Sequence, residues 1–403
     1  MRQQADRRRF LKLGAVLGGG ALGACSRPPD AEEGPSDLGK PVSSYGSRSP
    51  FEKAARLVPD TKTPEAASSR TPLASLYGTI TPNDLHFERH HAGVPRIDPA
   101  QHRLLIHGMV RRPLVFTVEE IRQFPTVSRV CFLECSGNSG SEWGVKTAPD
   151  VQRSHGLASC AEWTGVPLRL LLEEAGIEPG GEWLVAEGAD ACKMSRSVPR
   201  FKAMEDALVA FGQNGEALRP EQGYPLRLLV PGWEGNINVK WLRRIKVQQR
   251  PAYTKDETSK YTELMPDGTA RIFTFAMDAK SVITFPSGGQ KLTRTGPYEI
   301  SGLAWSGRGR ITRVDVSTDG GATWTPARLQ EPVQPMAFTR FSLAWTWNGG
   351  DAVLVSRATD ETGYVQPTRE ELVAVRGLNS NYHCNVQKPW RVSGDGSVRN
   401  ADA

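Results

Sequence analysis

The chain has 403 residues, a length that indicates two domains with extensions rather than one ordinary core. Its hydrophobic content of 38% and charged content of 23% are globular values, and 40 Gly with 29 Pro predict many strands and turns. Much of the net charge of +6 comes from the first 25 residues, where five Arg and Lys residues face only Asp6. The remainder has no basic stripe for nucleic acid, and no later stretch is apolar enough for a membrane helix.

The N-terminus reads as a targeting segment. Residues Arg7 to Lys12 (RRRFLK) precede a short, Gly-rich, weakly apolar stretch, which is too short to span a bilayer. This pattern resembles a twin-arginine export signal and predicts a signal segment over residues 1–25 and a periplasmic protein. Such export carries folded proteins, usually because they hold a cofactor. Leu22 to Cys25 also resembles a lipoprotein cleavage box, which leaves lipid anchoring at Cys25 open.

Residues 26–70 are rich in Pro, Ser, Glu and Ala and predict a linker or a loosely docked arm. The first domain is then expected over residues 71–255. Short helices and short strands mix there, which indicates an α+β domain. The helices are expected at 117–123 and 168–175, and the strands at 104–108, 127–133, 226–230 and 239–247. No Gly-x-Gly-x-x-Gly or Walker pattern supports nucleotide binding.

The second domain is expected over residues 256–403, including a C-terminal tail. Its strands are short, alternating and separated by Gly-containing turns, which indicates an all-β sandwich of immunoglobulin type. They are expected at 298–305, 311–317, 340–347 and 352–358. A hairpin is predicted where Val314 to Ser317 leads into Asp319-Gly320-Gly321. The surrounding Asp-box pattern occurs once, so it predicts a turn rather than a propeller blade.

The six cysteines are Cys25, Cys131, Cys135, Cys160, Cys192 and Cys384. Without Cys25 their number is odd, so at least one thiol is unpaired or has another task. The chain contains no Cys-x-x-Cys-His pattern, so we expect no c-type haem in it.

Three segments could carry chemistry, and each also has a purely structural interpretation. Asn83 to His91 holds three histidines. His86 and His90 would form a zinc pair on a helix, but Pro82 and Pro95 favour a loop. Val130 to Gly140 is a strand that delivers Cys135 to a Gly-rich turn. Backbone N–H groups and cations there are expected to lower the thiol pKa, and a soft thiolate suits a transition metal.

The third segment runs from Gln222 to Leu242. It places Arg227 and Lys240 beside glycine turns, an arrangement suited to a phosphate-bearing ligand. The alternative is a tight hairpin with charges on its surface.

Taken in order, these segments resemble the sulfite-oxidase family of molybdopterin oxidoreductases. The resemblance covers nearly the whole chain after residue 70. Within the family the chain is most similar to the molybdenum subunits of sulfane dehydrogenases of thiosulfate-oxidising systems. The segments closest to them are Glu134 to Asn138, Ser159 to Val166, Arg219 to Pro225, Trp233 to Asn236 and Lys280 to Thr284.

The resemblance implies a molybdopterin domain followed by an immunoglobulin-like dimerisation domain. It implies that Cys135 is the protein ligand of molybdenum, and that Arg89 and Tyr261 act with it in an oxo transfer to sulfur. It also implies a set of residues that contact the molybdenum-molybdopterin cofactor. These are Phe87, Arg89, His91, Cys135, Asp190, Gln222, Arg227, Asn238 and Lys240. Gln222 stands where many relatives carry His.

One departure from the family concerns the substrate. Many sulfite oxidases carry an arginine pair after the Cys-x-Gly-Asn motif, where this chain has Ser139-Gly140. Losing a cation disfavours a small free dianion such as sulfite and favours a sulfur group on the arm of a carrier protein. The resemblance further implies a separate dihaem cytochrome c as electron acceptor, a homodimer through the second domain, and a heterotetramer with the cytochrome.

Three alternative functions stay open at this point. The first is a sulfite:cytochrome c oxidoreductase of the same fold. The second is a cofactor-free, lipid-anchored β-sandwich binding protein. The third is a zinc hydrolase built on His86, His90 and His91.

Overall fold

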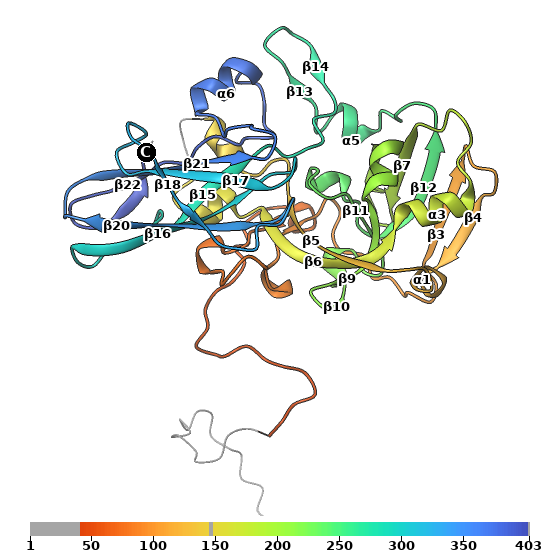
Figure 1. The fold of residues 1–403 in the computed structure, drawn as a ribbon. Helices are drawn as coiled ribbons and strands as arrows, with labels where there is room; N and C mark the ends of the chain where they lie inside the picture. Colours follow the sequence, from red (N-terminus) through yellow and green to blue (C-terminus); the bar gives the residue numbers. More distant parts are fainter. Residues whose placement is uncertain (1–40, 145–147, 402–403) are drawn as a thin grey trace, which may run out of the picture. The chain divides into compact units, whose positions relative to one another are not determined.

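The computed structural model describes residues 41–144 and 148–401 (Figure 1). The chain divides into two units, residues 1–52 and residues 53–403. The predicted signal segment, with Cys25, lies outside the described residues. Residues 41–52 contain no helix or strand. Within the described ranges, no helix is both long and apolar enough to cross a membrane.

Residues 53–70 belong to the second unit. The sequence suggested a linker or loosely docked arm over residues 26–70. Strand β1 (Ser68–Ser69) pairs antiparallel with β2 (Glu88–Arg89), which carries a predicted site residue. Leu57 and Arg70 also bridge to each other through their backbones. Backbone pairing and side-chain contacts such as the hydrogen bonds from Gln152 Nε2 to Ala55 O and Arg70 O dock this stretch.

The first half of the second unit contains two five-stranded sheets. One runs in the order β10-β9-β6-β5 with β11 beside β9, and the other in the order β4-β3-β12-β7-β8. The bounds are β3 Arg103–Gly108, β4 Leu114–Thr117, β5 Val127–Glu134, β6 Ala158–Pro167, β7 Trp183–Gly188, β8 Ser195–Pro199, β9 Leu208–Gln213, β10 Glu216–Ala217, β11 Arg227–Leu229 and β12 Leu242–Gln248.

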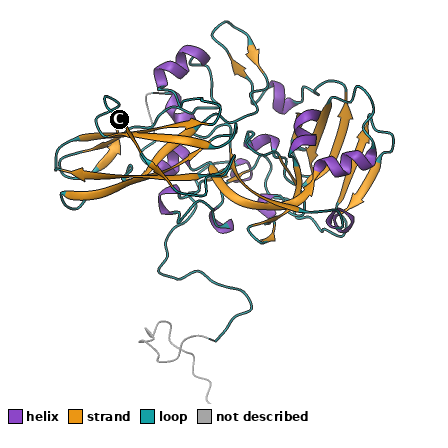
Figure 2. Ribbon diagram, viewed as in Figure 1, coloured by secondary structure: helices purple, strands orange, loops and turns teal. Residues whose placement is uncertain are grey.

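Short helices flank these sheets, as Figure 2 shows in purple. They are α1 Val118–Arg122, α3 Leu168–Ala175, α4 Arg200–Glu205 and α5 Lys255–Thr258, whereas α2 Val151–His155 packs against the second half through Val151. The predicted start of α1 is confirmed: the Thr117 hydroxyl accepts from the backbone N–H of Glu120 at 3.0 Å in a capping box. The predicted end of α3 is also confirmed, because Gly176 caps it at φ 71°.

The predicted strand at 239–247 begins later than expected, at Leu242. Trp241 has φ 54°, a left-handed conformation that a strand cannot continue through. Val239 and Lys240 therefore precede the strand, and Lys240 is free to turn towards a pocket. The alternation of apolar and basic residues could not reveal the late start of the strand, because a backbone dihedral causes it and the residue types do not change there.

The second half is a sandwich of two sheets, which confirms the predicted all-β domain. One sheet runs β15-β16-β20-β19 and the other β18-β17-β21-β22-β23. The predicted hairpin joins β17 to β18, and Asp319 closes its turn by accepting from the Thr323 backbone N–H at 2.9 Å. The bounds are β15 Lys280–Phe285, β16 Gly296–Trp305, β17 Ile311–Ser317, β18 Thr325–Pro326, β19 Arg328–Leu329, β20 Thr339–Trp347, β21 Ala352–Asp360, β22 Trp390–Val392 and β23 Val398–Asn400. A small sheet (β13 Glu263–Leu264, β14 Ala270–Arg271) and helix α6 (Arg369–Arg376) complete the half.

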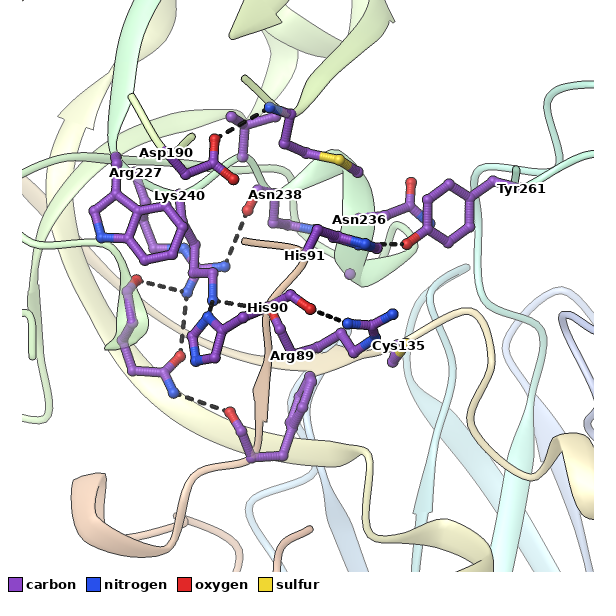
Figure 3. A pocket seen from close by; sticks show the side chains of 16 residues that line it. Arg89, His90, His91, Cys135, Asp190, Arg227, Asn236, Asn238, Lys240 and Tyr261 are labelled. Atoms are coloured by element: carbon purple, nitrogen blue, oxygen red, sulfur yellow. Dashed lines mark hydrogen bonds between the residues drawn. The ribbon is translucent and has the colours of Figure 1, made fainter. Parts of the chain in front are cut away.

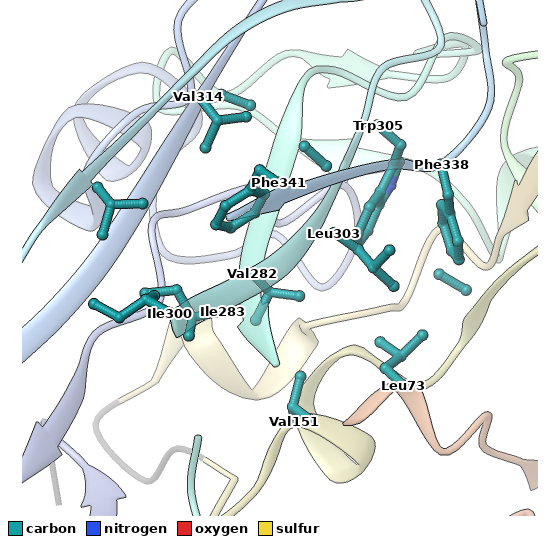
Figure 4. Packing of buried hydrophobic residues seen from close by; sticks show 14 of the residues in the cluster. Leu73, Val151, Val282, Ile283, Ile300, Leu303, Trp305, Val314, Phe338 and Phe341 are labelled. Carbon is teal, nitrogen blue, oxygen red and sulfur yellow. The ribbon is translucent and has the colours of Figure 1, made fainter. Parts of the chain in front are cut away.

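The two halves share a hydrophobic core. Figure 4 shows Leu73 and Val151 packed with sandwich residues such as Val282 and Leu303. Phe132 on β5 also lies against Trp305 on β16, with ring centroids 6.4 Å apart. Strand β5 leads directly to Cys135, so the shared core supports the sequence around that thiol from both halves. All five cysteines in the described part of the chain are free thiols.

Candidate functional site

All ten predicted site residues line one pocket, with an empty volume of about 670 Å³ that includes space open to solvent (Figure 3). They come from the loops around β2 and β11, the ends of β5 and β7, and the segment before β13. Sequence reasoning did not assign six further lining residues. These are His90, Met194, Gly235, Asn236, Val239 and Trp241. Three of the six (His90, Val239 and Trp241) adjoin a predicted site residue, so adjacency was the signal that could have found them.

Cys135 lies on a tight turn at the end of β5. Its backbone N–H donates to Leu157 O at 2.9 Å, and its carbonyl accepts from the Asn138 N–H at 2.8 Å. The thiol is thereby presented to the pocket by a fixed backbone. The expected low pKa is wrong for the thiol without a metal. Burial raises the pKa of Cys135, and this outweighs the lowering by the Gly137 N–H and by Arg89.

The histidine segment forms a loop, not a helix. A 3₁₀ turn (Asn83–Leu85) precedes β2, so His86 and His90 do not share a helical face. His86 packs against Phe87 and Trp163 in the core, and burial lowers its pKa to about 3. No group of three or more His, Cys, Asp or Glu side chains in the described ranges could hold a metal ion. This removes the basis for the zinc-hydrolase alternative.

Three cations face the pocket, and their hydrogen bonds go to neutral acceptors. Arg89 donates to Ala66 O at 3.0 Å and to His90 O. Arg227 donates to Gln222 O at 3.0 Å and to Asn238 O at 3.1 Å, while its buried Nε has no partner among the described residues. Burial lowers the pKa of Arg227 to about 9.

Lys240 is the third cation and belongs to a chain of polar contacts. Its Nζ donates to Glu221 O at 3.0 Å and contacts His90 Nδ1 at 2.9 Å. His90 Nε2 in turn contacts the Glu88 carboxylate at 2.7 Å, which fixes that nitrogen as a donor. Burial, and secondarily Arg227, lowers the pKa of Lys240 to about 7. A bound anion would favour the charged ammonium and raise this pKa again.

Tyr261 and His91 form a hydrogen bond of 3.0 Å at the opposite side (Figure 3). Burial, and secondarily Arg89, lowers the pKa of His91 to about 4, so its ring is neutral, and the tautomer of the ring sets whether Nε2 or the tyrosine hydroxyl donates. Burial raises the pKa of Tyr261, which keeps the phenol protonated. Asp190 is held by the Met194 N–H at 3.1 Å and by the Cys192 thiol at 2.7 Å.

Ser139 and Gly140, which replace the expected arginine pair, do not line this pocket. They line another cavity together with Arg70 and Arg153. Ser139 is buried, and its φ of 61° turns the chain into a 3₁₀ segment (Gly140–Trp143). Because Ser139 and Gly140 lie outside the main pocket, the lack of arginines at these two positions does not remove any of the cations that line it.

The residues fit a molybdopterin cofactor. A thiol suited to a soft metal lies in the same pocket as three cations that lack anionic partners among the described residues. A ligand phosphate would supply the missing negative charge, and the unpartnered Arg227 Nε would gain an acceptor.

Comparison with known proteins gives the same assignment. Residues 91–255 match the oxidoreductase molybdopterin binding domain, and residues 271–388 match the Mo-co oxidoreductase dimerisation domain. The sulfite oxidase of Gallus gallus is 33% identical over 318 residues, which cover 72% of this chain and 68% of that protein. The chain belongs to the sulfite oxidase family. The alternative of a cofactor-free binding protein is therefore wrong.

Other members of the family extend the comparison. The NADH nitrate reductase of Solanum lycopersicum is 32% identical over 371 residues, 80% of this chain. The chain spans about two fifths of the length of the nitrate reductases it matches. The crystal structure of the sulfane dehydrogenase SoxCD from Paracoccus pantotrophus matches with a TM-score of 0.89 and 50% identity. That match covers 91% of this chain and 95% of the other.

Proposed function

We propose that this member of the sulfite oxidase family is the molybdenum subunit of a sulfane dehydrogenase. It would oxidise the sulfane sulfur of a thiosulfate intermediate bound to a carrier protein. The observation that carries the proposal is the pocket itself, where Cys135 faces three cations that have no carboxylate partner in the described ranges. The 50% identity to the sulfane dehydrogenase supports this choice within the family.

The proposed cofactor is molybdenum-molybdopterin, which supplies oxygen-atom transfer coupled to electron transfer when bound. Cys135 would hold the metal, and Arg227 and Lys240 would pair with the phosphate. Phe87, Asp190, Gln222 and Asn238 would line the pterin, with Gln222 already fixed by its 2.9 Å bond to Phe87 O. These roles follow from the chemistry of each group and its place in the pocket.

The protein's own contribution to the reaction would be orientation, charge and proton handling. Arg89 would attract an anionic sulfur group. The Tyr261 hydroxyl, held by neutral His91, would donate a hydrogen bond or pass a proton at the reacting sulfur. The buried walls would exclude water from all but the open side of the pocket, which strengthens both interactions.

The partners and location belong to the same proposal. The chain lacks a haem-attachment pattern, so electrons would pass to a separate dihaem cytochrome c. The second half would form a homodimer, and two cytochromes would complete a heterotetramer. The twin-arginine pattern and Cys25 support export to the periplasm, with a lipid anchor as a further option.

The test is a steady-state assay of the metal-loaded protein with cytochrome c as acceptor. A thiosulfonated carrier protein and free sulfite are compared as substrates, and molybdenum is measured on the same preparation. We expect kcat/KM to be higher for the carrier by at least tenfold, or about 1.4 kcal/mol of transition-state binding. Equal or better use of sulfite would favour the sulfite:cytochrome c oxidoreductase instead. A protein without molybdenum would contradict both.

A further inference from the structure

Glu134, the residue before Cys135, is a charged side chain in the shared core. It is 0% exposed, and its partners come from both halves of the unit. Its carboxylate accepts from Asn138 Nδ2 at 2.9 Å and from Trp305 Nε1 at 2.7 Å, and it forms an ion pair with Lys280 Nζ. Lys280 begins β15 and Trp305 ends β16, so both belong to the sandwich.

Asn138 passes this anchoring on to the turn that carries the thiol. Its Nδ2 donates to Glu134, its Oδ1 accepts from the Leu157 N–H at 3.1 Å, and its own N–H donates to Cys135 O at 2.8 Å. Glu134 and Asn138 thus bracket Cys135 and bond to each other. Asn138 therefore links the Glu134 carboxylate to the turn on which the thiol sits.

Lys280 is 1% exposed and supplies the positive charge opposite Glu134. Burying such a pair has a desolvation cost that an apolar pair of similar volume avoids. The surroundings could accept an apolar pair, since Phe132, Ala279 and Val282 pack in the same cluster. The ion pair instead orients the Glu134 side chain, because a charge-assisted hydrogen bond fixes the direction of the carboxylate.

We propose that Lys280 is a positioning residue for the metal ligand. Through Glu134 and Asn138 it holds the Cys135 sulfur in the orientation that the metal needs. The second half of the chain then completes the metal site in addition to carrying the dimerisation domain. This inference rests on the proposed role of Cys135 as the metal ligand.

The chain offers a matched control on the same segment. Glu142 and Lys388 form another ion pair between the two halves at 2.7 Å, and they are 3% and 0% exposed. The chemistry, burial and domain crossing are the same as in the first pair. The difference is that Glu142 lies after the 3₁₀ segment has begun, and its carboxylate bonds to Ser141 and Lys388 rather than to the turn of Cys135.

The experiment compares Lys280→Met with Lys388→Met in the metal-loaded enzyme. Readouts are molybdenum content, the electron paramagnetic resonance of the Mo(V) state, kcat, KM and the thermal midpoint. We expect both variants to lose similar thermal stability, because each leaves a buried carboxylate unpaired. Lys280→Met alone should show shifted g-values and a kcat about a hundredfold lower, with molybdenum and KM retained. Lys280→Arg, which keeps the charge, should recover much of the loss.

Two results would overturn the inference: parental g-values and kcat in Lys280→Met, or equal changes in both variants. If Lys280→Met does not fold, the neutral double variant Glu134→Gln/Lys280→Met replaces it, and parental spectra and kcat there would overturn the inference too. Failure of the proposed function looks different. In that case Cys135→Ser would keep its molybdenum and activity, or the parent would use free sulfite as well as it uses the carrier-bound substrate.

Discussion

Two walls of the same pocket differ in how their charges are balanced. The wall that carries Cys135 is called the sulfur wall. There Glu134, the residue before Cys135, is paired with Lys280 and bonded to Trp305, so its charge is balanced by the protein itself. The wall that carries Arg227 and Lys240 is called the cation wall. These two side chains have only neutral partners among the described residues, and burial lowers the pKa of both. Under the proposed assignment, the protein would build its metal ligand in advance and leave the phosphate side to be completed by the cofactor.

The largest expected effect comes from the sulfur wall. Cys135→Ser should reduce turnover to background because the hard hydroxyl is a poor ligand for a metal that prefers thiolate. The fold should persist, because the turn is held by backbone bonds and by Asn138. The assay is cytochrome-coupled turnover together with circular dichroism. Cys131→Ser is the matched control, a buried thiol four residues earlier on β5, and it should keep its turnover.

A smaller effect is expected on the cation wall. If Arg227 pairs with the phosphate as proposed, Arg227→Met removes charge-assisted hydrogen bonds each worth about 1.5–3 kcal/mol and should weaken cofactor binding by about ten- to a hundredfold. Molybdenum retained after dialysis measures this loss. Arg153→Met, which lies on the other cavity, serves as the control and should retain the parental content. Equal retention in both variants would mean that Arg227 does not face the phosphate.

Tyr261→Phe probes the open side between the two walls. Loss of the hydroxyl should lower kcat by about ten- to a hundredfold while molybdenum content stays unchanged. Because burial raises the pKa of Tyr261, the parent should show no basic limb caused by this phenol below pH 9. A basic limb in the pH–rate profile of the parent that disappears in Tyr261→Phe would contradict this assignment.

The pH dependence of cofactor retention sharpens the comparison further. The pKa of Lys240 is lowered to about 7 in the ligand-free protein, and a bound phosphate would raise it again. Binding therefore takes up a proton above pH 7, and the cofactor Kd should rise by up to about tenfold per pH unit from there. Without cofactor the folded state binds fewer protons than the unfolded state, so stability should increase as pH rises above 7. Lys240→Arg should flatten both dependences.

Much of the site could be predicted from the sequence because its segments resemble those of a known family. Cys135 follows a clear strand, and Arg227 and Lys240 flank glycine turns, but the full set of ten was implied by the resemblance, and all ten line one pocket. Their individual roles stay predictions. The position of Ser139 was not foreseen, since this residue lines another cavity.

What escaped prediction depends on long-range contacts or on backbone conformation. Glu134 and Lys280 are 146 positions apart, and nothing local marks them as partners. The docking of residues 53–70 rests on backbone pairing of β1 with β2. The late start of β12 comes from the left-handed Trp241, and the raised pKa of Cys135 comes from burial that only the folded chain creates.

The most direct test of the account is X-ray absorption at the molybdenum edge of the purified protein and of Cys135→Ser. The account predicts molybdenum in the parent with a protein sulfur in its coordination sphere. The variant should show one sulfur neighbour fewer in whatever metal it retains. An unchanged sulfur count in Cys135→Ser, or a parent without molybdenum when expressed with cofactor synthesis intact, would contradict it.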